Sequence, residues 1–415
     1  MARAVSGDAA RYRVLAACTL GTIVSMTPAV HSVFGLFLLP LSETFQWPRA
    51  QISVVLGMMA VVGAVVYPLA GRFADGHGAR RMLIVANLVF GVAIAALALT
   101  TRHIGQFYLT FFIVSLAGSV AGTPLFSKVI AEWFDKGRGM ALGISAGMGS
   151  GVGSIAIPVI AAMVVGQYGW RAGYLAIGAI VLIVGFPALF LMLRDAPRSV
   201  VAADADTAPS TEGLSLAEAA RMPRFWVLLV SIAVGAGTTT AIFSHVVPIV
   251  VDRGFSISAG TAAVSMFALV GSTWQIATGR VLDRSRSPKV VIPMYAMAVV
   301  GLALLELGMG TPALMLGGAL LGVGLGAQYG TMPYLIARYF GLRAFGTIIG
   351  VMYSAVIVAQ GVTPVLLDAA YDAQGNYRMG VLVCALCLSA GAALMLLLPR
   401  YQADEAASPS PLALA

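Results

Sequence analysis

The chain has 415 residues, of which 59% are hydrophobic and only 10% are charged, and its mean hydropathy is +0.92. A soluble domain cannot bury so much apolar surface, so the composition excludes an ordinary globular protein and predicts a membrane protein. The formal net charge is +8, but the basic residues are spread over many short segments instead of one patch, which argues against nucleic-acid binding.

Twelve apolar segments follow one another along the chain, each long enough to cross a bilayer as a helix, which takes ~20 residues. The first is too long for the apolar part of a cleavable signal peptide, and eleven more follow it. We therefore expect an all-α, multi-pass membrane protein with twelve transmembrane helices. The predicted spans are 14–40, 52–73, 82–101, 107–131, 139–165, 172–193, 225–251, 258–282, 290–309, 312–337, 345–367 and 379–398.

The distribution of lysine and arginine predicts the orientation, because these residues favour cytoplasmic loops. With the N-terminus placed inside, all but five of the 25 basic residues lie in or beside cytoplasmic segments. This asymmetry predicts that both termini are cytoplasmic. The five residues on the other side are Arg49, Arg102, Arg171, Arg253 and Arg378.

An internal repeat relates the two halves of the chain, with an offset of 208 residues that falls to 207 further along. It predicts two pseudo-symmetric six-helix bundles, 1–193 and 223–400, joined by a cytoplasmic linker at 194–222 and followed by a disordered tail at 401–415. Parallel repeats of this kind are a transporter architecture, with the substrate between the halves near the middle of the membrane. Matching pairs are Gly71 and Gly279, Asp75 and Asp283, and Gly143 and Gly350.

A charged loop, GRFADGHGARR at 71–81, follows the second span, and a degraded copy, GRVLDRSR at 279–286, follows the eighth. Its glycines allow a tight turn and close helix approach, and its Asp and Arg residues can form charge-assisted bonds between helix ends. Such a latch on one face is what alternating access requires. A basic loop that only sets topology is the simpler alternative, but the recurrence in both halves argues against it. The candidate gating residues are Gly71, Arg72, Asp75, Arg80, Arg81, Arg280 and Asp283.

The first copy fits the signature loop of the major facilitator superfamily, Gly-x3-Asp-x2-Gly-x-Arg/Lys-Arg/Lys, and the whole chain resembles that family. Finer marks resemble its monocarboxylate porter branch, which includes bacterial oxalate/formate and lactate carriers. The resemblance implies a monomeric secondary transporter of the bacterial inner membrane that moves a small molecule and is coupled to protons. The marks are PRFW at 223–226, FSHVVPIVVDRG at 243–254, EWFDKGRGMALG at 132–143, ARYFGLRAFGTIIG at 337–350 and YDAQGNY at 371–377.

The sequence departs from this branch at two positions where the resemblance implies cations. The branch carries a substrate-binding Arg four residues before the second motif glycine, where this chain has Gln275. The oxalate carriers have a Lys in helix 11, near the depth of Gln360. An amide donates hydrogen bonds to a carboxylate but supplies no charge. A small dianion is therefore disfavoured, and a larger, weakly acidic, neutral or zwitterionic solute is favoured.

Polar side chains inside apolar spans are costly, so each is a candidate for function. His31 and His245 can bind substrate, carry a proton, or only join two helices by a hydrogen bond. Lys128 either pairs with Glu132 four residues on or faces the cavity as a replacement cation. Trp274 can line a cavity for a bulky solute or pack between helices. The predicted substrate-binding residues are His31, Phe34, Lys128, His245, Trp274, Gln275, Tyr329, Tyr353 and Gln360.

The sequence contains no catalytic set, and we expect neither an enzyme nor a bound cofactor. It has no phosphate-binding P-loop, so we expect gradients rather than ATP to drive it. Its three cysteines lie inside apolar spans without His or acidic neighbours, so no metal site is expected. The sequence favours a carrier of a small organic carboxylate, with protons and membrane lipid as its other partners. The alternative is an efflux carrier for neutral or apolar compounds.

Overall fold

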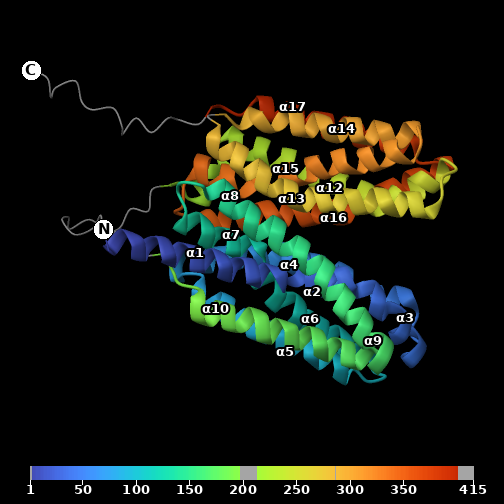
Figure 1. Cartoon of the computed structure of the whole chain (residues 1–415), viewed down its shortest axis with the longest axis horizontal. Coiled ribbons are helices and arrows are strands. Elements are labelled where there is room, and N and C mark those ends of the chain that lie inside the picture. The colour runs from blue at the N-terminus through green and yellow to red at the C-terminus, as the bar shows by residue number, and fades with distance from the viewer. Residues whose placement is uncertain (1, 197–212, 286, 401–415) are drawn as a thin grey trace, which may run out of the picture.

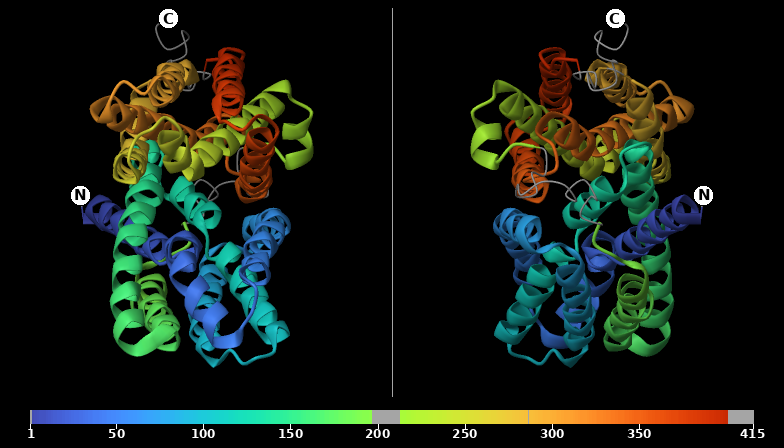
Figure 2. Two further views of the ribbon diagram at one scale, coloured as in Figure 1. Left: turned by 90° about the vertical axis from the view of Figure 1, so that its right-hand side faces the viewer. Right: turned by 90° about the vertical axis from the view of Figure 1, so that its left-hand side faces the viewer.

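The computed structural model describes residues 2–196, 213–285 and 287–400. These residues form two helical bundles that lie side by side (Figure 1). The predicted tail at 401–415 and most of the predicted linker lie outside the described residues. Figure 2 shows the two bundles end-on, with the first half of the chain below and the second half above.

The N-terminal half consists of α1 Ala2–Ile23, α2 Met26–Ala29, η1 His31–Val33, α3 Phe34–Phe45, α4 Arg49–His77, α5 Arg80–Ala96, η2 Leu97–Leu99, α6 Ile104–Val120, α7 Thr123–Trp133, α8 Arg138–Gly143, the π-helical η3 Ile144–Gly149, α9 Ser150–Ile180, the π-helical η4 Val181–Gly185 and α10 Phe186–Met192. The short α11 Leu216–Ala220 precedes the C-terminal half. That half consists of α12 Pro223–Asp252, α13 Ile257–Arg284, η6 Pro288–Val291, α14 Ile292–Leu307, α15 Thr311–Phe340, α16 Phe345–Gln374 and α17 Arg378–Leu396.

Within the described residues, ten helices are long and apolar enough to cross a membrane, and one bent pair adds an eleventh. The longest of them, Arg138–Met192, has 55 residues, more than twice the ~20 that a bilayer needs. At Gly169 its backbone leaves the helical region, with φ 80° and ψ 172°, so this stretch is two helices that meet at a sharp corner. The described residues therefore form the twelve spans that the sequence predicts.

The first span is broken, whereas the sequence predicts one continuous helix over residues 14–40. Its two parts, Ala9–Ala29 and His31–Phe45, are bent by 43° relative to each other. Pro28 lacks a backbone N–H and cannot continue the hydrogen-bond ladder, and the hydroxyl of Ser25 donates to the carbonyl of Thr22 at 2.8 Å. The break places His31 on a short 3₁₀ turn.

The hydrophobic cores show where the two halves meet. One core contains residues of both halves, such as Ile130 of α7 and Ile348 of α16. Two further cores belong to one half each, one around Phe37 and Phe107 and the other around Phe267. We call the end with the shared core the closed end and the other the open end. The bundles diverge from the closed end, at the left of Figure 1, towards the open end.

At the closed end, the halves approach each other through paired glycines. Gly71 of α4 faces Gly346 of α16, and Gly279 of α13 faces Gly139 of α8. A Cβ atom on Gly71 or Gly279 would collide with the backbone carbonyl of the glycine opposite. Only glycine fits at these two crossings, and the crossings are related by the internal repeat.

Gly71→Ala should push the halves apart at this crossing, whereas Gly57→Ala should not. Both residues lie on α4, but a Cβ atom on Gly57 meets nothing within 4 Å. A helical Gly→Ala change normally adds about 0.5–1 kcal/mol of stability. We expect Gly57→Ala to raise the melting temperature of the purified protein slightly and Gly71→Ala to lower it. Equal gains for the two variants would contradict the tight crossing.

Candidate functional site

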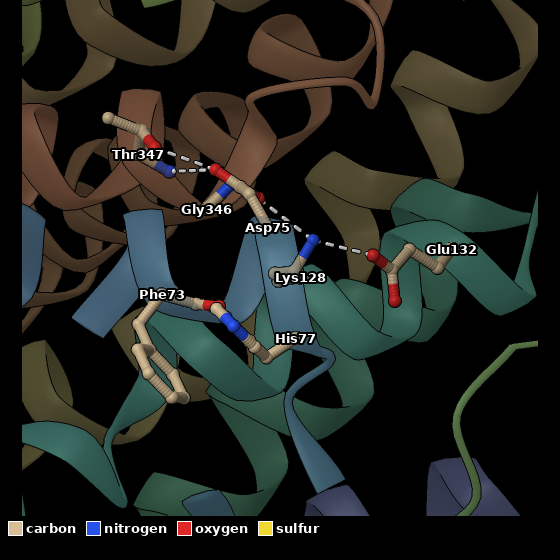
Figure 3. A network of polar contacts seen from close by, with 7 residues as sticks. All are labelled: Phe73, Asp75, His77, Lys128, Glu132, Gly346 and Thr347. Carbon is tan, nitrogen blue, oxygen red and sulfur yellow. Dashed lines mark hydrogen bonds and ion pairs between the residues drawn. The ribbon is translucent and has the colours of Figure 1, made fainter. Parts of the chain in front are cut away.

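Asp75, in the last turns of α4, caps the start of α16 in the other half (Figure 3). Its carboxylate accepts hydrogen bonds from the backbone N–H groups of Gly346 at 2.8 Å and Thr347 at 2.7 Å, and from the Thr347 hydroxyl at 2.7 Å. The first N–H groups of a helix have no partner within it, and the helix start carries partial positive charge. One carboxylate thus ties the two halves together.

Asp283 makes the equivalent contact from the C-terminal half to the N-terminal half. Its carboxylate accepts hydrogen bonds from the backbone N–H groups of Gly139 and Met140 of α8, both at 2.9 Å. Asp75 and Asp283 are the pair that the internal repeat relates. Both predicted gating aspartates therefore lie between the halves, and their part in gating stays a prediction.

Lys128 belongs to this closed-end network. Its Nζ lies 2.9 Å from an oxygen of Asp75 and 2.6 Å from an oxygen of Glu132, and its side chain is only 3% exposed (Figure 3). The pair with Glu132 is one of the two interpretations that the sequence left open. With two carboxylates on its ammonium group, Lys128 stabilises the latch, and we do not include it in the binding site.

Arg80 attaches the motif loop to the end of α10. Its guanidinium donates to the carbonyls of Leu193 at 2.7 Å and Phe190 at 3.2 Å, while its backbone N–H donates to Asp195 at 3.1 Å. A cation at the C-terminal carbonyls of a helix complements the helix dipole. The other three predicted gating arginines, Arg72, Arg81 and Arg280, are exposed.

A second polar cluster lies in the C-terminal half, and its centre is Gln360 of α16. The Gln360 amide donates to the Tyr329 hydroxyl of α15 at 2.5 Å and to the Thr240 hydroxyl of α12 at 2.8 Å. Two of the predicted binding residues thus meet, and Thr240 joins them. The cluster offers amide and hydroxyl groups without a formal charge.

Two aromatic rings mark the edge of the closed end, next to this cluster. Tyr67 of α4 packs edge-to-face on Tyr353 of α16, with 5.9 Å between the ring centroids. Nearby, the Ser354 hydroxyl donates to the Ala64 carbonyl at 2.6 Å, which again joins the halves. Gln360 lies two turns of α16 beyond Tyr353, towards the open end. The cluster therefore lies where the halves begin to part.

Gln275 lies between the halves, but on a different pair of helices from Gln360. It belongs to α13, and a Cβ atom on Gly147 of η3 would be 2.8 Å from the Gln275 Cβ. Its amide oxygen is buried and has no hydrogen-bond partner among the described residues, and the same holds for the Trp274 indole N–H. An unsatisfied buried acceptor is costly, which makes it a candidate to receive a hydrogen bond from a ligand.

Two predicted binding residues lie on the broken first span. His31 is exposed on its 3₁₀ turn, and the neighbouring Ser32 hydroxyl donates to Ser154 of α9 at 3.0 Å. Phe34 packs against the hydrophobic core of the N-terminal half at the open end. The structure does not bring Phe34 to Trp274, which belongs to the periphery of the shared core instead.

His245 of α12 contacts Asp368 of α16 at 2.7 Å, nearer to the open end than the Gln360 cluster. The sequence analysis did not single out Asp368, Thr240 or Tyr67. For Tyr67 a signal existed, because the offset of 208 residues makes it the counterpart of Gln275. For the other two, no pattern in one sequence shows which helices become neighbours.

A groove of about 790 Å³ lies on another face of α16, between α12, α16 and α17. Its walls include apolar residues such as Val358, Leu366 and Val383, whose side chains are at least half exposed in the absence of a membrane. In a bilayer, apolar exposed faces of helices contact lipid chains. The groove is therefore separate from the polar cluster.

Asp75→Asn should loosen the closed end. An asparagine presents one acceptor oxygen and turns an NH₂ donor towards the N–H groups of α16, so at least one charge-assisted hydrogen bond of about 1.5–3 kcal/mol is lost. This loss should raise the population separated at the closed end roughly tenfold or more. Distances between spin labels at Gly76 and Arg343, in a cysteine-free background, measure that population.

The control is Asp135→Asn at the same end, because Asp135 is 81% exposed and pairs with Arg138 of its own half. It should leave the distance distribution unchanged. An unchanged distribution in Asp75→Asn would show that the carboxylate does not hold the halves together.

Comparison with curated proteins finds transporters of low sequence identity. The chain is 23% identical over 344 residues to the uncharacterized MFS-type transporter YhjX of Escherichia coli, covering 80% of this chain and 83% of that protein. It is 22% identical over 408 residues to monocarboxylate transporter 12 of Rattus norvegicus, covering 91% and 83% of the two chains.

Among solved structures, the chain resembles the E. coli transporter FucP in its outward conformation, with a TM-score of 0.71, 16% identity, and coverage of 95% and 99% of the two chains. It also resembles the proton:xylose symporter XylE, with a TM-score of 0.72, 12% identity, and coverage of 95% and 97%. A family model described as Major Facilitator Superfamily matches residues 15–364 and 263–413. The chain therefore belongs to the Major Facilitator Superfamily, a family of multi-pass membrane transporters rather than enzymes.

Proposed function

We propose that this protein is a secondary active carrier that moves a small organic carboxylate, of the monocarboxylate type, by proton-coupled alternating access. The observation that carries the proposal is the asymmetry of the molecule, which is latched at one end and parted at the other. Between these ends lies the polar cluster of Gln360, Tyr329 and Thr240, which we propose a solute reaches from the open end. The names of relatives such as monocarboxylate transporter 12 support the substrate class.

The closed end is proposed to face the cytoplasm, as part of a bacterial inner membrane protein. The described chain begins and ends there, at Ala2 and Arg400 (Figure 1). The motif loop at 71–81 and the described part of its copy, 279–285, lie at the same end, and their arginines favour a cytoplasmic location. In this orientation the open end faces outward and receives solute from outside the cell.

Gln360, Tyr329 and Thr240 are proposed to form the main substrate contact. Gln275 and His31 lie on other helices and are proposed to contact the solute only when the protein changes conformation. Amides and hydroxyls bind a carboxylate by hydrogen bonds, each worth about 1 kcal/mol when neutral and about 1.5–3 kcal/mol to a charged group. A site without a formal cation binds a single carboxylate less tightly than an Arg site does, but it tolerates a larger organic part.

The direct test is uptake of labelled lactate, pyruvate and benzoate into proteoliposomes that contain the purified protein. We expect at least one of them to accumulate when the pH outside is below the pH inside, and to equilibrate without accumulation when the pH is equal. Absence of uptake for all three under both conditions would contradict the carboxylate proposal.

Gln360→Ala should weaken substrate binding about tenfold, which corresponds to ~1.4 kcal/mol, the loss of about one hydrogen bond. The measurement is the substrate concentration at half-maximal uptake. The matched control is Gln374→Ala, which removes the same side chain from the exposed end of the same helix. A variant at Gln360 with unchanged affinity would place the solute elsewhere.

The second candidate function is efflux of neutral compounds, and the uncharged character of the Gln360 cluster favours it. A neutral solute can use the same amide and hydroxyl groups without a counter-charge. The two functions differ in the direction in which a proton gradient moves the solute. Expulsion of a neutral fluorescent dye, together with no uptake of carboxylates, would favour efflux.

A further inference from the structure

His245 and Asp368 form a pair of titratable groups outside the Gln360 cluster. The His245 Nε2 lies 2.7 Å from a carboxylate oxygen of Asp368, and the pair joins α12 to α16. The imidazole side chain is 11% exposed, whereas the carboxylate is 59% exposed. An accessible acid therefore touches a largely buried base, which is an arrangement through which a proton can enter.

The hydrogen bonds of the imidazole determine how many protons the pair holds. The His245 Nδ1 lies 2.8 Å from the backbone carbonyl of Ala241, and a carbonyl only accepts, so Nδ1 carries a hydrogen. A neutral imidazole with Nδ1–H has a lone pair on Nε2, which would face the Asp368 carboxylate. Two acceptors at 2.7 Å repel each other, so the contact requires one more proton between them.

The Ser244 hydroxyl does not change this count. It lies 3.0 Å from Nδ1 and donates to the Ala241 carbonyl at 2.9 Å, so its own hydrogen is already used. The hydrogen bond between His245 and Asp368 thus requires this proton.

The surroundings of the pair favour a bound positive charge. The titratable groups near it are acidic or phenolic, and Arg253, directly after α12, pairs with Glu306 of α14. The imidazole packs 5.8 Å from the Tyr377 ring, measured between centroids. The titratable groups around Tyr377 are Asp252 on α12, and Asp368, Tyr371 and Asp372 on α16.

The position of the pair along α16 allows proton binding to affect the outer segment of this helix. Pro364 lies inside α16, four residues before Asp368, and removes the hydrogen bond to the carbonyl of Gln360. The outer segment of α16, 365–374, is therefore attached to the rest of the helix by a weakened turn. Asp368 lies on this segment, and its contact with His245 adds a polar link to α12 beside the packing of Leu367 in the core of the C-terminal half.

The same weakened turn carries the substrate cluster. Gln360 is the residue whose carbonyl Pro364 leaves unpaired, and its side chain binds Thr240, which lies five residues before His245 on α12. A movement of the outer segment of α16 thus changes the backbone at Gln360. Coupling between two sites needs such a shared element with two arrangements.

We propose that the His245–Asp368 pair is a proton-binding site that fastens the outer segment of α16 to α12 when a proton from the open side is bound. Loss of the proton releases the segment. The role of this proton in coupling rests on the proposed function, whereas the fastening itself does not depend on any substrate.

The first experiment needs no substrate. Hydrogen–deuterium exchange of the segment 365–374 is measured in the purified protein at about pH 6 and about pH 8.5, on either side of the range where histidine changes charge, and corrected for intrinsic exchange. We expect the wild-type segment to exchange roughly threefold more slowly at the lower pH. Asp368→Asn and His245→Gln should both lose this difference.

Asp372→Asn is the matched control, because Asp372 lies one turn further along the same helix and is exposed. It should keep the difference. The proposal is overturned if the wild type shows no pH dependence, if Asp368→Asn keeps it, or if Asp372→Asn loses it too. Both variants probe the same pair. If His245→Gln fails to fold, the result for Asp368→Asn alone decides whether the pair binds the proton.

The second experiment uses labelled lactate in proteoliposomes. Asp368→Asn should exchange lactate across the membrane at equal pH nearly as fast as the wild type but lose at least about tenfold of the accumulation driven by a pH gradient, because a neutral Asn–His contact forms without an extra proton. Full pH-driven accumulation in this variant would overturn the coupling role. If the wild type transports no lactate, the proposed function fails, and the exchange experiment alone decides the proton site.

Discussion

The arrangement of the whole molecule depends on two carboxylates, each of which holds the start of a helix in the opposite half. Asp75 caps α16 and Asp283 caps α8, at crossings where paired glycines let the backbones touch. The capped N–H groups have no partner of their own, so each carboxylate satisfies donors that would otherwise need water. Because water can also hydrogen-bond to these N–H groups, the two contacts can in principle be exchanged for water, and their part in gating stays a prediction.

The remaining features of the closed end support these two contacts. Lys128 neutralises the partly buried Asp75, and Arg80 fixes the following turn to α10, so the carboxylate is held on a rigid frame. Among the described residues, the hydrophobic core that both halves share lies at this end, and Gln360 lies further along α16, towards the open end.

The side chains of the Gln360 cluster carry no formal charge, whereas charged side chains lie on either side of it, towards the closed end and towards the open end. The closed end has its charged network around Asp75, and the C-terminal half has the His245–Asp368 pair towards the open end. Two proline-weakened helices, α12 and α16, connect the pair to the cluster. If the proposed solute and proton sites are correct, the residues that contact the solute are different from those that bind the proton.

The sequence by itself determined the number of spans, the two-fold repeat and the family, because apolar length, basic asymmetry and motif spacing are local or periodic properties. It also identified Asp75 and Asp283 as counterparts, since the offset of 208 residues relates them. It did not predict the break in the first span near His31, where loss of a helix bond at Pro28 competes with an otherwise continuous apolar run.

Only the tertiary structure decided which polar residues meet. From the sequence, Lys128 could pair with an anion on its own helix or contact a solute in the cavity. In the structure it pairs with Glu132 and also with Asp75 of α4, so it belongs to the network at the closed end. Gln275 and Gln360 look alike in sequence, yet they lie on separate interfaces. Asp368 became a candidate only through its contact with His245, which lies 123 residues away in the sequence. Such contacts depend on how helices pack across the chain, and no spacing within one segment contains that information.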